Sequence, residues 1–134
     1  MTQVALGALK AKAERLSLPI PVEMLASWEN SQEAWCVKDI HGVIVYLNDK
    51  YQEFISLLQG CPAVYPQGVN QHDERVLREV RTVIAVGVCF DHGLNRCFPF
   101  YCERSPYFNR LAEVVGIISH VRPVISLSPS FFKR

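Results

Sequence analysis

The sequence predicts an α+β fold, because strand-like runs stand at two places in the chain and helical patterns lie before and between them. The first strand-like region is a pair of short runs rich in β-branched and aromatic residues, which favour strands. The second holds three more runs of the same kind. Five strands are expected, at residues 34–37, 43–47, 86–90, 96–109 and 114–121.

The composition indicates one globular domain with a hydrophobic core. The chain has 134 residues, of which 49% are hydrophobic and 20% charged, so it is neither fibrous nor disordered. The net charge is only +1. Nucleic-acid-binding surfaces usually carry a strong basic excess, so we expect no direct contact between this chain and nucleic acid.

Cysteine usage and hydropathy suggest a cytoplasmic protein. The five cysteines are odd in number and lack the spacing of a disulfide framework, which fits a reducing compartment. The longest apolar run, Val83–Phe90, is far shorter than the roughly 20 residues that span a bilayer. The first residues do not resemble a secretion signal. We therefore expect no membrane association.

Residues 2–16 are expected to form an amphipathic helix. Its apolar stripe is Leu6, Leu9, Ala13 and Leu16. The stripe has two interpretations: it packs on its own domain, or it pairs with a second copy and makes a homodimer. Two heptads are too few to hold a dimer alone. Pro19 and Pro21 end this helix, and a second one is expected at Val22–Glu29.

The first strand pair is expected to be a hairpin that leads directly into a helix. Asp39 can hydrogen-bond the backbone of the turn, and Gly42 can take a positive φ there. Asn48 follows the second strand at once and is a good N-cap, so a helix is predicted for residues 48–58. A second central helix, capped by His72 or Asp73, is predicted to carry its apolar stripe as far as Ile84.

This order of elements resembles that of PAS domains. The hairpin followed by Asn48 at the start of a helix is one part of the match, and Ser105-Pro106 with Glu113-Val114-Val115-Gly116-Ile117 is the other. The resemblance covers about residues 34–123. Arg110-Leu111-Ala112 departs from the usual Asp and Gly in the last turn, which leaves the type of that turn open.

The resemblance implies a PAS fold: a five-stranded antiparallel sheet with helices on one face and N-terminal helices on the other. It divides the chain into N-terminal helices (1–33), a PAS core (34–123) and a linker (124–134) toward a missing output domain. The layout is similar to the sensory half of bacterial LuxR-type and TraJ-type transcription regulators. No helix-turn-helix is visible in the chain.

In such a module a small apolar ligand or a partner would be sensed in the core and the change passed to the output domain. The residues expected to line a ligand cavity are Val37, Tyr46, Phe54, Ile84, Val88 and Phe98. Two alternatives remain at this point. One is a ligand-free structural dimerisation domain with a filled core, and the other is a small enzyme that uses cysteine and histidine.

No metal is expected, and the cofactor is left unknown, with haem and flavin disfavoured. Cys89-x-x-His92, with Cys97 and Cys102, approaches metal-ligand spacing, but the last two lie five apart on one strand and face opposite sides. His72 lies near the position of a haem ligand in some PAS domains, yet a capping role explains it equally well. The reactive-cysteine motif of flavin-binding PAS domains is absent around Cys61. No nucleophile or paired-carboxylate motif is present, so we expect no enzyme activity.

Overall fold

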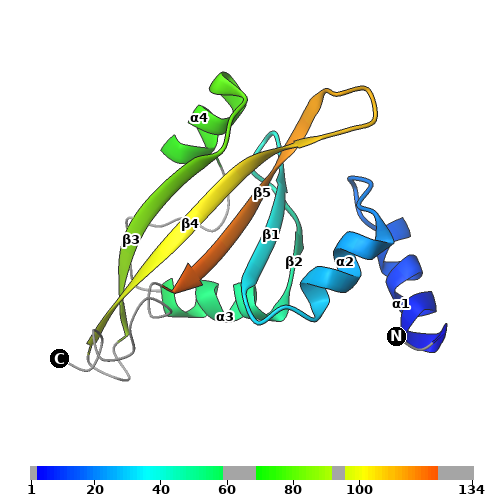
Figure 1. Ribbon diagram of the computed structural model, residues 1–134, viewed down its shortest axis with the longest axis horizontal. Coiled ribbons are helices and arrows are strands. Elements are labelled where there is room, and N and C mark those ends of the chain that lie inside the picture. Colours follow the sequence, from blue (N-terminus) through cyan, green and yellow to red (C-terminus); the bar gives the residue numbers. More distant parts are fainter. Residues whose placement is uncertain (1–2, 59–68, 92–95, 124–134) are drawn as a thin grey trace.

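The computed structural model describes residues 3–58, 69–91 and 96–123 (Figure 1). Two helices precede the first strand, two lie between the second and third strands, and the chain ends in a long meander. The elements are α1 (Gln3–Glu14), α2 (Val22–Glu29), β1 (Ala34–Asp39), β2 (Ile44–Leu47), α3 (Asp49–Leu58), α4 (Gln71–Glu79), β3 (Val83–Asp91), β4 (Arg96–Phe108) and β5 (Val114–Pro123).

The strands form one five-stranded sheet in the order β2-β1-β5-β4-β3, and all neighbours are antiparallel. β1 and β5 are therefore adjacent at the centre, although they lie at opposite ends of the sheet-forming sequence. The segment with α3 and α4 carries the chain from the β1–β2 edge to the β3 edge. The predicted α+β class with a five-stranded antiparallel sheet is confirmed.

Helices cover both faces of the sheet, as expected. On the outer face, α2 lies beside β1 and β2 and α1 packs on α2, and their shared cluster includes Leu25, Trp28, Val37 and Tyr46. On the inner face, α3 and α4 form two smaller clusters with the sheet. Their buried residues are Ala34, Cys36, Tyr51, Cys102 and Val121 beneath α3, and Val76, Val83 and Ile117 beneath α4.

The two hairpin turns in the described chain share one geometry. In the β1–β2 turn, Asp39 Oδ1 accepts hydrogen bonds from the backbone N–H groups two and four residues later, and Gly42 has φ 82°. In the β4–β5 turn, Asn109 Oδ1 accepts the equivalent two bonds, and Ala112 has φ 61°. Asn109 and Ala112 thus occupy the places of the usual Asp and Gly, which settles the turn type that the sequence left open.

Gly116 allows the two central strands to approach closely. It lies opposite Asp39 in the β1–β5 ladder. A Cβ atom at this position would lie 2.4 Å from the carbonyl oxygen of Lys38, a distance that real side chains do not show. The glycine of the Val-Val-Gly-Ile motif is therefore required by backbone packing in this sheet.

The prediction for the second central helix was wrong at both ends. The N-cap is Asn70, whose side chain accepts from the Asp73 N–H, while the Asp73 side chain accepts from the Asn70 N–H. The helix ends at Glu79, because Val80 takes a left-handed conformation. Val83 and Ile84, which were assigned to the helical stripe, begin β3 instead. Their β-branched side chains favour a strand, and this tendency overrode the helical spacing.

Candidate functional site

Three charged side chains meet between the sheet and α4. Lys38 of β1 donates a hydrogen bond from Nζ to Asp73 Oδ2 over 3.1 Å, and Arg104 Nε of β4 lies 3.1 Å from Asp73 Oδ1. The exposed fractions of the three side chains are 3%, 0% and 12%, in that order. We call Lys38, Asp73 and Arg104 the interior charge cluster.

The fold positions each member of this cluster for a local reason. Asp73 stands in the first turn of α4, where its carboxylate also accepts from the backbone N–H of Asn70 and closes the capping box. Lys38 follows a register shift in the β1–β2 ladder. Arg104 lies on β4, paired with Ser119 of β5. The cluster thus ties the start of α4 to the middle of the sheet.

The Arg104 guanidinium is incompletely satisfied. Its Nε and Nη1 atoms are buried without a hydrogen-bond partner among the residues that the structure describes. The 3.1 Å contact with Asp73 is therefore an ion pair whose N–H is not aligned for a hydrogen bond. Asp73 Oδ1, the other atom of this ion pair, is likewise buried without a hydrogen bond among the described residues. Buried polar groups without hydrogen bonds are uncommon in native interiors, so this part of the cluster keeps unused hydrogen-bonding capacity.

Beside the charge cluster, the inner face carries two buried thiols. Burial raises the pKa of the Cys36 thiol to about 12, and it also raises the pKa of Cys102. Tyr51 of α3 lies in the same cluster as Cys36, and burial holds the pKa of this tyrosine well above its usual value. At neutral pH all three groups are uncharged, so they add polarity to the inner face without adding charge.

On the outer face, aromatic rings stack from α2 to β5. Trp28 stacks on Trp35 with centroids 5.5 Å apart, and Trp35 stacks on His120 with centroids 3.9 Å apart. The His120 ring also makes a 2.9 Å contact from Nε2 to Glu33 Oε1. This stack joins the N-terminal helices to the central strand β5.

A second polar contact ties both N-terminal helices to β2. The Tyr46 hydroxyl donates to Glu29 Oε2 over 2.7 Å, and Lys12 Nζ lies 2.8 Å from Glu29 Oε1. Burial opposes ionisation of Glu29, yet the hydrogen bonds from Lys12 and Tyr46 lower its pKa. Glu29 thus connects Tyr46 of the sheet to Lys12 of α1.

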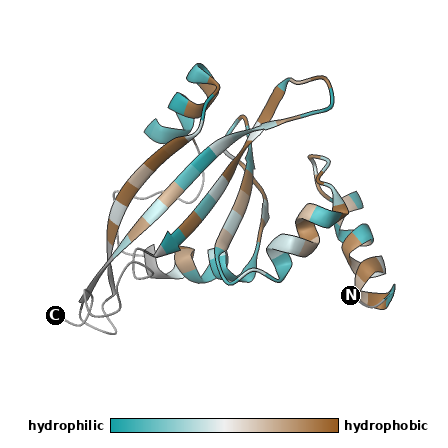
Figure 2. Ribbon diagram, viewed as in Figure 1, coloured by the Kyte–Doolittle hydropathy of each residue, from teal (hydrophilic) through white to brown (hydrophobic). Residues whose placement is uncertain are grey.

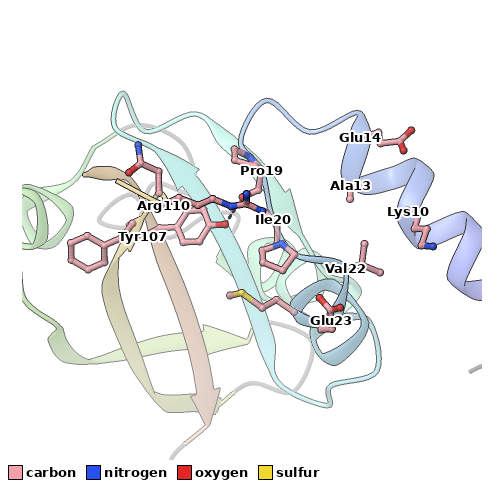
Figure 3. Close-up of a pocket in the computed structure, with 13 residues that line it drawn as sticks. Lys10, Ala13, Glu14, Pro19, Ile20, Val22, Glu23, Tyr107 and Arg110 are labelled. Atoms are coloured by element: carbon pink, nitrogen blue, oxygen red, sulfur yellow. Dashed lines mark hydrogen bonds between the residues drawn. The ribbon is translucent and has the colours of Figure 1, made fainter. Parts of the chain in front are cut away.

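A groove of about 700 Å³ opens between the N-terminal helices and the β4–β5 hairpin (Figure 3). Tyr107 forms part of its wall and donates a hydrogen bond to the carbonyl of Pro19, which fixes the linker between α1 and α2. The lining is largely apolar, with two acidic and two basic residues. It consists of Lys10, Ala13, Glu14, Pro19, Ile20, Pro21, Val22, Glu23, Met24, Tyr107, Phe108, Asn109 and Arg110.

The structure does not bring the six predicted ligand residues together. Val37 and Tyr46 are buried on the outer face, under α1 and α2. Phe54 packs on the inner face, in the cluster of Tyr51 and Cys36. Ile84 and Val88 are 64% and 63% exposed. The side chain of Phe98 lies outside the described residues. The predicted single cavity is therefore split between two faces of the sheet.

The α1 stripe packs mainly on its own chain. Leu9 is 8% exposed in the outer cluster, and Ala13 and Leu16 pack against that cluster. Leu6 is 37% exposed, and Val4, which was not assigned to the stripe, is 84% exposed. Of the two interpretations of this helix, the structure shows the packing on its own domain. Pairing with a second copy stays a prediction.

The described residues contain no group of three or more side chains from His, Cys, Asp and Glu that would hold a metal ion. The side chains of Cys89 and Cys97 and the whole of His92 lie outside the described part, so the predicted spacing cannot be placed. His72 is partly buried in the first turn of α4, and Asn70 rather than His72 caps the helix. Among the described residues, no helix has both the length and the apolar character needed to cross a bilayer.

Sequence reasoning missed the interior charge cluster. One signal was present: Lys38 directly follows the apolar run Trp35-Cys36-Val37. A strand that is covered on both faces leaves no solvent-facing side for a charge, so a lysine there needs a buried partner. Arg104 gave a weaker signal of the same kind, because it lies two residues after Cys102 and so on the same face. Asp73 was recognised only as a candidate cap and a favourable charge at the start of the helix.

No protein-family model matches the chain, and no curated protein is significantly similar to it. Solved structures do match. The VqmA dimer of Vibrio cholerae, described as a LuxR-type receptor with a target DNA, matches with a TM-score of 0.62 and 16% identity. The match covers 81% of this chain and 53% of that one, so this chain spans about half the length of the receptor.

Two isolated PAS domains match over nearly their whole length. The PAS domain of Bordetella pertussis BvgS gives a TM-score of 0.58 at 18% identity, covering 83% of this chain and 93% of that chain. The PAS domain of the fruit-fly ELK potassium channel gives 0.55 at 12% identity, covering 76% and 94%. These likenesses establish the architecture. The chain has a PAS fold, and it resembles the PAS domain of a LuxR-type receptor.

Proposed function

We propose that this chain is the sensory and dimerisation module of a bacterial transcription regulator. A small ligand binds between the sheet and helices α3 and α4, and the resulting change passes to a DNA-binding domain beyond this chain. The likeness to VqmA supports this proposal, because one VqmA structure is a complex with DPO and another is a dimer that has a target DNA. The proposed role is regulatory and involves no catalysis.

The interior charge cluster is the observation that carries the ligand part of the proposal. A core that only fills space gains most from apolar side chains, because removing charges from water is expensive even when they are paired. Lys38, Asp73 and Arg104 nevertheless lie in the buried layer under α4. A few convergent polar groups among apolar walls are typical of ligand sites.

The ligand-binding prediction is revised to the inner face. Phe54 keeps its predicted role, since it lies in the inner cluster and meets Phe100 edge-on with centroids 5.0 Å apart. Val37 and Tyr46 are instead assigned to the support of α1 and α2. Ile84 and Val88 project to the opposite, exposed side of β3.

The proposed dimer surface is also revised. Leu9 is buried within its own chain and is not free to meet a partner. β3 instead exposes Ile84, Val86 and Val88, at 64%, 65% and 63%, and its hydrophobic character is visible in Figure 2. We propose that a second copy covers this β3 stripe together with Val4 of α1. Residues 1–33 would then serve as a cap, 34–123 as the PAS core and 124–134 as the linker.

A ligand-free structural dimerisation domain is the second candidate. The Lys38–Asp73 pair favours it, because Asp73 already has a structural task in the capping box of α4. In this second hypothesis, the interior charge cluster fixes the position of α4 and binds no ligand.

Native mass spectrometry of the purified chain separates the two candidates. A dimer with additional non-covalent mass supports the sensory module, whereas a dimer of bare chains supports the structural one. A monomer at micromolar concentration contradicts dimerisation under both. Val86→Asp should convert the dimer to a monomer, and Leu111→Asp, at a hairpin residue that is 79% exposed, should leave it dimeric.

A further inference from the structure

The inner face carries a net positive charge. Lys38 and Arg104 contribute two positive charges, and Asp73 contributes one negative charge. The neighbouring titratable groups on the inner face are Cys36, Cys102 and Tyr51, and burial keeps their protons in place at neutral pH. The net charge of these described groups is therefore +1, on side chains that are at most 12% exposed.

Arg104 also has hydrogen-bonding capacity to spare. Its Nη1 and Nε atoms are buried and make no hydrogen bond among the described residues, and Nε lies 3.1 Å from Asp73 Oδ1 in the ion pair. A buried N–H group without an acceptor loses its hydration and gains no hydrogen bond in return. A ligand oxygen placed against Nη1 would therefore restore both the charge balance and the missing hydrogen bond.

We infer that the ligand of the proposed sensory site is a small monocarboxylate with an apolar body, bound through its carboxylate to Arg104. The inference rests on the proposed function. A planar guanidinium matches a carboxylate in geometry and forms strong, charge-assisted hydrogen bonds with it. One negative charge neutralises the cluster, whereas a phosphate dianion would reverse its sign.

The side chains under α3 and α4 indicate the chemical character of the rest of the ligand. Beneath α4, the fully or almost fully buried neighbours are Val76, Val83 and Ile117. Beneath α3, Phe54 and Tyr51 contribute aromatic rings that meet at 62° with centroids 5.8 Å apart. Branched aliphatic or aromatic carbon suits these walls, and a second charged or strongly polar group does not.

Paired acids and amides test the inference directly. The purified full chain is titrated at pH 7 with benzoate and isovalerate, and with benzamide and isovaleramide, by calorimetry and thermal shift. The acids should bind and raise the melting temperature, and the amides should bind at least tenfold more weakly. Arg104→Gln should abolish the difference between acid and amide. Arg78→Gln, at an α4 arginine whose side chain is 68% exposed, should preserve it.

Other outcomes would overturn the inference. Equal binding of acid and amide, or a preference for inorganic phosphate, contradicts a monocarboxylate but leaves the sensory function intact. If none of the four probes binds and native mass spectrometry finds a neutral adduct, the monocarboxylate is again contradicted and the sensory function is again left intact. If no probe binds and no adduct is found, both proposals fail. If Arg104→Gln does not fold, the inference is still tested by Arg104→Lys and by the comparison of acid with amide in the wild-type protein.

Discussion

Lys38 and Asp73 are 35 residues apart in the chain, yet Nζ and Oδ2 lie 3.1 Å apart with almost no exposure to solvent. Replacing Asp73 by Ala would leave two buried cations without their counter-ion. We expect a loss of about 3–5 kcal/mol in the free energy of unfolding, as for other broken buried ion pairs. Urea denaturation followed by circular dichroism measures it.

The control for this substitution is Glu79→Ala at the other end of α4. Glu79 lies within ion-pair distance of Arg75, Arg78 and Arg81, but on the surface of the helix. Exposed pairs contribute little to stability, so the unfolding midpoint should hardly move. If both variants unfold at the same urea concentration, the interior charge cluster has no structural importance.

Gly116→Ala should destabilise the protein by about 1–3 kcal/mol, as overpacked cores do. The added Cβ would lie 2.4 Å from the Lys38 carbonyl oxygen and force β1 and β5 apart. Gly7→Ala is the matched control, because nothing lies within 4 Å of a Cβ at that helical position. It should raise stability by up to about 1 kcal/mol through helix propensity. Thermal unfolding of the two variants should therefore shift in opposite directions.

Ala112→Gly should stabilise the protein. Ala112 has φ 61°, a left-handed conformation that costs an L-residue roughly 1–2 kcal/mol, whereas glycine adopts it freely. The greater freedom of glycine in the unfolded chain offsets about 0.4–1 kcal/mol of the gain. We expect a net gain of about 0.5–1 kcal/mol. Gly42→Ala, in the matching turn, should have the opposite sign, and equal signs would contradict the equivalence of the two turns.

Local chemistry made the hairpins and the start of α3 predictable. Asp39, Gly42 and Asn48 act through bonds to residues a few positions away, so their roles can be inferred from neighbouring sequence. The interior charge cluster could not be inferred in this way, because it joins three elements that meet only after the sheet has formed. The orientation of β2 could not be predicted either. Alternate residues on both faces of this strand are apolar, so the pattern did not show that Tyr46 faces the N-terminal helices.

Asn48 should be among the residues least tolerant of change. Its buried amide accepts from the Trp35 and Tyr51 N–H groups and donates to the Trp28 and Glu33 carbonyls. Asn48→Ala removes the N-cap of α3 and leaves buried partners unsatisfied. We expect a loss of more than about 2 kcal/mol in chemical denaturation.

Asn30→Ala provides the comparison for Asn48. Asn30 is exposed, and its side chain makes a hydrogen bond with the Ala26 carbonyl at the end of α2. Its loss should change stability by less than about 0.5 kcal/mol. A cost at Asn48 no greater than that at Asn30 would mean that the four hydrogen bonds of the buried amide do not hold in solution.

The buried thiols should be inert and should make the fold sensitive to alkali. Because burial raises the pKa of Cys36 to about 12, this cysteine stays a thiol at pH 8 and is a poor nucleophile. Iodoacetamide labelling, read by peptide mass spectrometry, should therefore leave Cys36 and Cys102 unmodified in the native protein and modify both in urea. Labelling of either in the native state would instead favour a reactive cysteine and the enzyme alternative.

The raised pKa of Cys36 also determines how the stability of the fold depends on pH. Below about pH 9 the Cys36 thiol keeps its proton in both the folded and the unfolded chain. Between pH 9 and 12 the unfolded chain loses that proton while the folded chain retains it, so the unfolded state is favoured and stability falls as pH rises. Cys36→Ala should make this fall less steep, as urea midpoints measured at pH 8, 9 and 10 would show. An identical pH profile in wild type and variant would mean that the thiol ionises as easily in the folded sheet as in water.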